Sequence, residues 1–165
     1  METFEAISIR VSVREYQDKP IEKPLLEKLV DAGRKAPTAR KVEPWEFIVV
    51  TEKKAIQALG EKVSPNGSFL KGAAACIVIF SQDTKYYLED CCAATENILL
   101  TVADVGLGAC WIAGDKKPYD SDVAAMLGVP AGFKLIGLIA LGWPAKQVAQ
   151  VKSRSLRDVL HWERF

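Results

Sequence analysis

The stretch EDCCAATENILLTVADVGLGACWIAG, Glu89–Gly114, decides the fold. From about Tyr86 to Val105 apolar residues recur at helical spacing with few polar faces, which predicts a long helix. A helix of this kind is buried either in the centre of the core or at a subunit interface. Gly106 and Gly108 are expected to end the helix, and ACWIAG (109–114) predicts a short strand or loop.

The glycine pair Gly106 and Gly108 does not meet the requirements of a dinucleotide fingerprint. That fingerprint has a third glycine three residues after the second, where this chain carries Trp111, and it lies between a strand and a following helix. Here the pair follows a helix. We therefore interpret it as a helix C-cap and a tight turn.

The segments on either side of this stretch mix helical and strand patterns. Strands are predicted where β-branched, aromatic or continuous apolar residues run together, and helices where apolar residues recur every three or four positions. The order lacks the regular alternation of a doubly wound sheet, so we expect an α+β fold in one domain, residues 1–165. Predicted helices cover 3–9, 25–33, 54–63 and 120–127, and predicted strands cover 45–51, 74–81 and 135–144.

The composition is that of an ordinary globular protein. Its 165 residues are 49% hydrophobic and 26% charged, with 22 basic against 21 acidic side chains. Such a balance excludes a broad nucleic-acid or membrane footprint. No apolar stretch is long enough to span a bilayer, and the first ten residues do not resemble a secretory signal. We expect a cytoplasmic protein.

The reactive side chains are few. Cys76, Cys91, Cys92 and Cys110 contain no CxxC spacing, and His161 is the only histidine, so no metal site is expected. We predict that all four cysteines are small buried apolar residues. A single histidine also argues against Ser-His or Cys-His nucleophilic catalysis. An enzyme with this sequence would depend on a cofactor.

Two basic clusters lie near opposite ends of the chain. SIRVSVREY (8–16) places Arg10 and Arg14 around Ser12, and Lys152 and Arg154 flank a serine near the other end. Cations beside hydroxyl groups suit a compact anion, because they give phosphate charge-assisted hydrogen bonds. If folding brings the two ends together, the clusters form one phosphate pocket; the alternative is solvated surface.

A stiff loop separates the second predicted helix from the first predicted strand. APTARKVEPW (36–45) contains two prolines and is expected to expose Thr38, Arg40 and Lys41. Rigid loops on a scaffold commonly carry functional residues. The alternative is a solvated connector.

These segments together resemble the FMN-dependent nitroreductase family along nearly the whole chain. SIRVSVREY is similar to the family's opening R-x-S-x-R-x-[FY], and APTARKVEPWEFIVV to its A-P-[ST]-x-x-N-x-Q-P-W-x-F-I-V-V segment. The Glu89–Gly114 stretch resembles the family's long central helix and following turn. LIGLIALGWP resembles its last core strand, and VKSR its C-terminal basic pair. The resemblance implies a central, mainly antiparallel sheet flanked by helices in an intertwined homodimer.

The resemblance assigns both basic clusters to one cofactor. It implies that Arg10, Ser12, Lys152 and Arg154 hold the phosphate of FMN. It places Arg14 near the pyrimidine edge of the flavin, where a cation stabilises the negative charge that develops on hydride transfer.

The remaining contacts implied by the resemblance come from two places. Thr38, Ala39 and Arg40, with Lys41 beside them, would reach the FMN of the partner subunit, because the family binds FMN at the homodimer interface. The segment from Ile112 to Gly114 would line the isoalloxazine ring. Its members are Ile112, Ala113 and Gly114, with the backbone N–H of Ala113 facing the ring nitrogen that carries the hydride. Asn66 is a further candidate for a contact at the flavin edge.

Three positions depart from the family pattern. Lys41 replaces the usual asparagine, Glu43 the glutamine, and Ala113 a frequent glutamate at the turn. FMN binding is expected to be retained, and these departures are expected to affect the specificity for the electron acceptor.

The resemblance implies an oxidoreductase that moves a hydride from NADH or NADPH to FMN and then to an acceptor such as a nitroaromatic or a quinone. The flavin performs the chemistry, so no protein side chain is expected to be catalytic in its own right. Two alternatives remain. One is a non-catalytic protein that stores or senses FMN, and the other is a nucleotide- or phosphopeptide-binding module that uses only the basic clusters.

Overall fold

The computed structural model describes residues 1–165, in which helices and strands alternate irregularly. The helices are α1 Thr3–Ile9, α2 Lys23–Gly33, α3 Lys53–Lys62, α4 Tyr87–Asp104 and α5 Asp120–Met126. The strands are β1 Trp45–Val50, β2 Ala75–Gln82, β3 Gly108–Ala113 and β4 Phe133–Gly142. Short 3-10 turns occupy η1 Ala39–Lys41, η2 Ser68–Gly72 and η3 Leu156–Asp158.

The four strands form one sheet in the order β1-β2-β4-β3, and every neighbouring pair is antiparallel. The two central strands are almost entirely buried, as their continuous apolar sequences predict. Ala140 on β4 lies between Cys76 of β2 and Cys110 of β3 in the strand register. The expected α+β fold with an antiparallel sheet is therefore confirmed.

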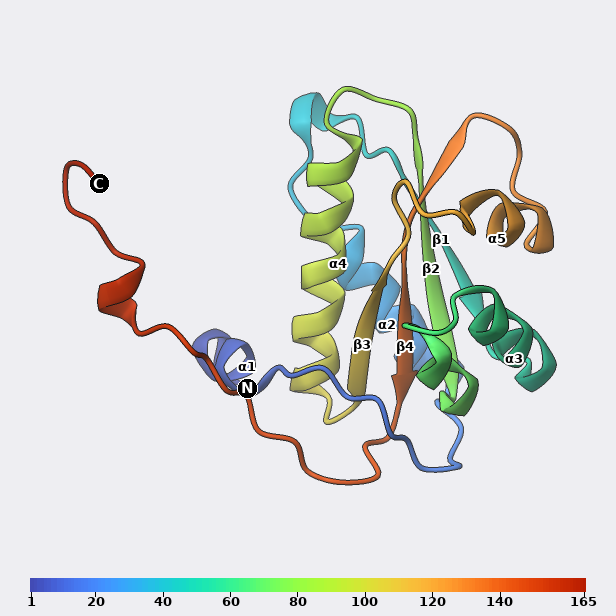
Figure 1. Cartoon of the computed structure of the whole chain (residues 1–165), viewed down its shortest axis with the longest axis horizontal. Coiled ribbons are helices and arrows are strands. Elements are labelled where there is room, and N and C mark those ends of the chain that lie inside the picture. The colour runs from blue at the N-terminus through green and yellow to red at the C-terminus, as the bar shows by residue number, and fades with distance from the viewer.

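Helices cover both faces of the sheet (Figure 1). Because side chains alternate across a strand, Ile77 and Ile79 of β2 pack in a cluster with α2 and α4, whereas Val78 and Phe80 pack in a second cluster with α3 and α5. The buried face of α4 includes Ile98, which is fully enclosed. The long helix thus belongs to the core, as one of the two sequence interpretations held.

The two edges of the sheet differ. The outer edge of β3 is partly covered by the N-terminal segment, in which the backbone N–H of Val13 donates to the carbonyl of Ala109 over 2.8 Å. A side chain at Gly108 would place its Cβ 2.8 Å from the Cβ of Val13, so glycine permits this close approach. The opposite edge, β1, pairs only with β2, and Val49 on it is exposed.

The end of the chain returns to its beginning and then leaves the body. After β4, the backbone N–H of Ala145 donates to the carbonyl of Glu15 over 3.0 Å. The side-chain amide of Gln150 then donates to the carbonyl of Arg10 over 2.6 Å. Beyond this point the tail, residues 151–165, extends away from all other elements (Figure 1) and is exposed throughout.

Most predicted elements are confirmed within two residues, and three details were wrong. Gly108 starts β3 instead of ending the preceding helix. Cys92 is half-buried because it faces away from the sheet, whereas the other three cysteines are buried. Thr38 is half-buried, since its hydroxyl bonds to a helix. No helix is both long enough and apolar enough to cross a membrane.

Candidate functional site

The first basic cluster runs along the outer edge of β3. Ser12 forms a parallel bridge with Ala109, which fixes the segment between Arg10 and Arg14 beside the strand. Tyr16 anchors the far end, because its hydroxyl donates to the carbonyl of Val13 over 2.6 Å and burial raises the pKa of that hydroxyl. The cluster therefore has a fixed backbone in the isolated chain.

Arg10 is where the two ends of the chain meet. Its carbonyl accepts the hydrogen bond from Gln150, and its guanidinium Nε lies 3.8 Å from a carboxylate oxygen of Glu96 on α4. Lys152 and Arg154 follow Gln150 directly, at the start of the tail. The two ends of the chain thus meet at Gln150, but Lys152 and Arg154 lie in the exposed tail, where the guanidinium of Arg154 donates to the carbonyl of Asp158.

Arg14 is held by an aromatic ring rather than by a carboxylate. Its guanidinium carbon lies 5.6 Å from the centroid of the Phe69 ring in η2, and it forms no ion pair. Burial raises the pKa of the nearby Cys110 thiol, and the positive charge of Arg14 opposes that rise. Asn66 lies in the turn just before η2, which places it on the same side of the molecule as Arg14.

The turn after β3 is rigidly packed. Ile112 is buried, and the backbone N–H of Gly114 donates to the carbonyl of Ile136 over 2.9 Å. A Cβ at Gly114 would lie 2.6 Å from Cγ of Leu135, so only glycine fits there without displacing β4. Ala113 is exposed between them, and its carbonyl accepts a hydrogen bond from the hydroxyl of Tyr119.

The loop that carries Thr38 lies at the other end of α4. The hydroxyl of Thr38 donates to Asp90 over 2.8 Å, and the backbone N–H of Ala39 donates to the second oxygen of the same carboxylate over 3.0 Å. In Figure 1 η1 lies beside the first turn of α4, whereas α1 lies beside its last turns. Within one chain, Thr38, Ala39, Arg40 and Lys41 therefore lie at the opposite end of α4 from the Arg10 segment.

The loop adopts an unusual backbone. Arg40, Lys41 and Glu43 have φ values of 57°, 57° and 51°, in the left-handed region that favours glycine. Each such residue costs about 1–2 kcal/mol relative to ordinary backbone. A conformation of this kind persists only where surrounding contacts hold it, and it is common at functional sites.

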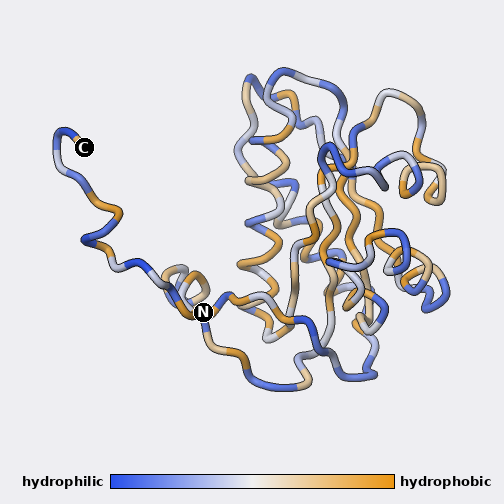
Figure 2. Tube along the Cα trace, in the orientation of Figure 1, coloured by the Kyte–Doolittle hydropathy of each residue, from blue (hydrophilic) through white to orange (hydrophobic).

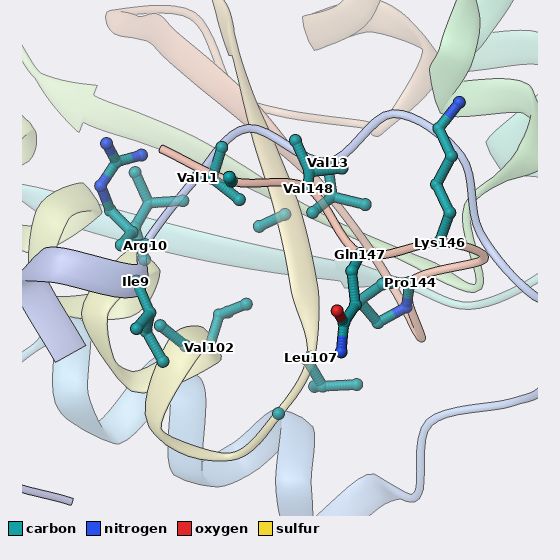
Figure 3. Close-up of a pocket in the computed structure, with 15 residues that line it drawn as sticks. Ile9, Arg10, Val11, Val13, Val102, Leu107, Pro144, Lys146, Gln147 and Val148 are labelled. Carbon is teal, nitrogen blue, oxygen red and sulfur yellow. The ribbon is translucent and has the colours of Figure 1, made fainter. Parts of the chain in front are cut away.

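A cavity of about 720 Å³ lies beneath the N-terminal segment (Figure 3). It is enclosed by Ile9 to Val13, by the end of α4 and by the chain after β4, and its walls are mostly apolar. The guanidinium of Arg10 points away from Val102 and Leu107 in Figure 3. An apolar interior does not suit a phosphate.

Three residues that shape these positions were missed by the sequence analysis: Asp90, Phe69 and Tyr119. One sequence feature could have pointed to Asp90: it is an acidic residue in the first turn of a helix that is otherwise largely apolar. No sequence feature pointed to Phe69 or Tyr119, because an aromatic residue next to a turn is common in any core.

The family model described as "Putative TM nitroreductase" matches residues 2–164. This chain belongs to the nitroreductase family. The resemblance drawn from the sequence is thereby confirmed, and the family's model spans both basic clusters.

Similar proteins agree with the nitroreductase assignment. A "Putative NADH dehydrogenase/NAD(P)H nitroreductase" of Archaeoglobus fulgidus is 31% identical over 175 residues, covering 99% of each chain. The crystal structure of a protein with the same description from Parabacteroides distasonis matches with a TM-score of 0.92 at 33% identity, covering 99% of this chain and 98% of that one. An "FMN-dependent Nitroreductase" from Clostridium difficile matches with a TM-score of 0.90 at 29% identity, covering 98% and 99%.

Proposed function

We propose that this nitroreductase is an NAD(P)H-dependent FMN oxidoreductase, and that residues 1–165 form one FMN-binding domain. The observation that carries the proposal is the position of Arg14, a cation without a carboxylate partner, beside the outer edge of the strand that ends at Ala113. A positive charge there can respond to a bound anion because no internal charge neutralises it.

The residues present fit the chemistry of FMN. A phosphate ester needs cations and hydroxyl donors; Arg10 and Ser12 supply them beside β3, and Lys152 and Arg154 follow Gln150, which bonds to Arg10. The flat ring system needs an exposed backbone edge, and in the segment Ile112–Gly114 at the end of β3 it is Ala113 that is exposed. Asn66 would contact the flavin rim near Arg14.

Bound FMN would supply hydride transfer from NADH or NADPH to an acceptor, such as a nitroaromatic or a quinone, in ping-pong turnover. Arg14 would stabilise negative charge at the pyrimidine edge of the flavin. The backbone N–H of Ala113 would face the ring, and Tyr119 holds the same turn through the Ala113 carbonyl.

The site needs a second copy of the chain. Thr38, Ala39, Arg40 and Lys41 lie at the opposite end of α4 from the Arg10 segment, so they serve the FMN of the partner in a homodimer. Arg40 and Lys41 form no ion pair in their own chain and are exposed. Their charges are therefore available to a ligand held by the other subunit.

The tail supplies a reason for the two chains to associate. It carries several exposed apolar side chains, and Figure 2 shows apolar positions along the tail, away from the body of the chain. Burying such surface is the main favourable term in protein association. The exposed apolar residues of the tail are Val151, Leu156, Val159, Leu160, Trp162 and Phe165.

A groove of about 830 Å³ between α2 and β1 suits this tail. Leu26 and Val30 of α2 line it together with Phe47 and Val49 of the edge strand β1. An extended segment of the partner can both fill the groove and pair with the edge of β1. The homodimer that we propose is intertwined in this sense.

The deciding experiment is an anaerobic titration of the FMN-reconstituted protein with NADPH, followed by its visible spectrum. Stoichiometric bleaching of bound flavin supports the oxidoreductase. If the flavin stays oxidised with NADPH and with NADH, the protein stores or senses FMN. A spectrum identical to that of free FMN would overturn the flavoprotein proposal and leave an anion-binding module.

A further inference from the structure

Asp90 is the one charged side chain among the buried residues of the chain, with 6% of its surface exposed. It lies in the first turn of α4, where the helix dipole favours a negative charge. No lysine or arginine lies within ion-pair distance of it. Its two carboxylate oxygens are instead taken by neutral donors, the hydroxyl of Thr38 and the backbone N–H of Ala39.

These two hydrogen bonds hold the start of the loop, and Thr38 links it to the end of the loop. The Thr38 hydroxyl oxygen, which donates to Asp90, also accepts the backbone N–H of Glu43 over 3.0 Å. The three residues therefore form a chain of hydrogen bonds that closes the loop around Arg40 and Lys41. Both of those residues have positive φ, so their backbone does not adopt this shape without support.

Because the carboxylate of Asp90 accepts only from neutral donors, it does not neutralise the charges of Arg40 and Lys41. Arg40 and Asp90 line the same small cavity of about 120 Å³, yet they form no ion pair. Had the carboxylate paired with Arg40, the guanidinium would be neutralised within its own chain. As built, Asp90 fixes the backbone while the charges of Arg40 and Lys41 remain directed to other partners.

We propose that Asp90 is the positioning residue of the flavin site, acting through the Thr38–Glu43 loop on the FMN of the partner subunit. The proposal rests on the proposed function, since it names how one part of that site is held. Asp90 itself touches no cofactor. Its role is to fix where Arg40 and Lys41 stand when the partner's FMN is bound.

The test compares three variants of the full-length protein. Asp90→Ala removes both acceptors and leaves Thr38 and Ala39 without their partner, whereas Asp90→Asn keeps the shape and can accept from Ala39 while donating to Thr38. Glu89→Ala removes a neighbouring carboxylate that is exposed and serves as the matched control. The measured quantities are the Kd for FMN from flavin fluorescence and the rate of tryptic cleavage after Arg40 and Lys41 in the apoprotein.

We expect Asp90→Ala to raise the Kd for FMN about tenfold, as the loss of one or two hydrogen bonds to a charged group predicts. Tryptic cleavage at the loop should accelerate in the same variant. Asp90→Asn should recover most of the FMN affinity, and Glu89→Ala should match the unmodified protein. If Asp90→Ala fails to fold, Asp90→Leu fills the space of the carboxylate without accepting either hydrogen bond, and it should weaken FMN binding in the same direction.

Two results would overturn the inference. One is an Asp90→Ala protein that binds FMN as tightly as Glu89→Ala does, with loop cleavage unchanged. The other is faster cleavage with an unaltered Kd, which would make Asp90 a purely structural residue. In both cases the unmodified protein still binds FMN, so the proposed function stands; unmodified protein that binds no FMN would overturn both.

Discussion

The guanidinium of Arg14 stacks over the ring of Phe69 at 5.6 Å, and no carboxylate competes for it. The ring face carries partial negative charge, which holds the cation without cancelling it. This arrangement differs from an ion pair, because an ion pair would offset the charge that the proposed site requires. Phe69 therefore sets the direction of Arg14 and leaves its field open to a ligand.

Replacing Phe69 by leucine tests this arrangement. The variant keeps an apolar side chain but loses the ring face, and a cation–π contact at an exposed site contributes about 0.5–1 kcal/mol. We expect the Kd for FMN to rise roughly two- to fivefold and the reduction potential of the bound flavin to fall. Potentiometric titration measures the second effect. Arg14→Gln should lower the potential further, and a Phe69→Leu protein with an unchanged potential would contradict the role given to the ring.

Replacing Gly114 by alanine tests the packing of the turn after β3. The new Cβ would lie 2.6 Å from Cγ of Leu135 and 2.9 Å from the backbone nitrogen of Gly137. Overpacking of this kind costs about 1–3 kcal/mol, which corresponds to a fall in Tm of roughly 2–4 °C per kcal/mol. Thermal unfolding followed by circular dichroism measures it. Gly72→Ala is the control, because nothing lies within 4 Å of its Cβ and its Tm should hardly change.

Replacing Trp162 by serine tests the tail. Its side chain is 78% exposed in the single chain, so its loss should leave the fold of the body intact. If the tail packs on a partner, loss of a buried tryptophan should weaken dimer association by about 3 kcal/mol or more. The variant should then be monomeric at concentrations where the unmodified protein is dimeric. Light scattering after gel filtration measures the mass. Equal dimer stability in the two proteins would show that the tail is not part of the interface.

The cysteines are expected to be slow to react. Burial raises the pKa of Cys91 to about 11, and burial likewise raises the pKa of Cys92 and Cys110 above their usual range. A raised pKa leaves little thiolate at pH 7, so reactivity should increase as the pH rises toward those values. Mass spectrometry after brief iodoacetamide treatment should find Cys92 labelled first, because it is the only one of the four cysteines that is half-exposed.

Replacing Cys91 by serine should leave both FMN binding and turnover intact. A Cys91→Ser protein that holds FMN but is inactive would support thiol chemistry.

The sequence was informative where one short pattern determines the outcome. The apolar periodicity of α4 and the continuous apolar runs of β2 and β4 were enough to predict their elements, because burial on one or both faces leaves that signature. Element ends were less certain. Gly108 starts a strand because the N-terminal segment packs against it, a contact between distant parts of the chain that no local pattern contains.

The site shows the same limit. The residues of the two basic clusters and the Thr38 loop could be named from motifs, and their roles toward FMN remain predictions. The residues that hold them could not be found. Asp90 meets Thr38 across 52 positions of sequence, and Phe69 meets Arg14 only after η2 packs beside the N-terminal segment. Such partners are chosen by the tertiary fold, which propensity and spacing do not encode.

The open edge of β1 has a consequence for how this protein must be handled. An uncovered edge strand with an exposed apolar side chain such as Val49 is a template on which other chains can add strands and aggregate. If the partner's tail covers that edge, association protects the protein from precipitation. A variant that has lost its dimer contacts should then precipitate more readily than the unmodified protein at the same concentration, because its edge is exposed while the fold is still intact.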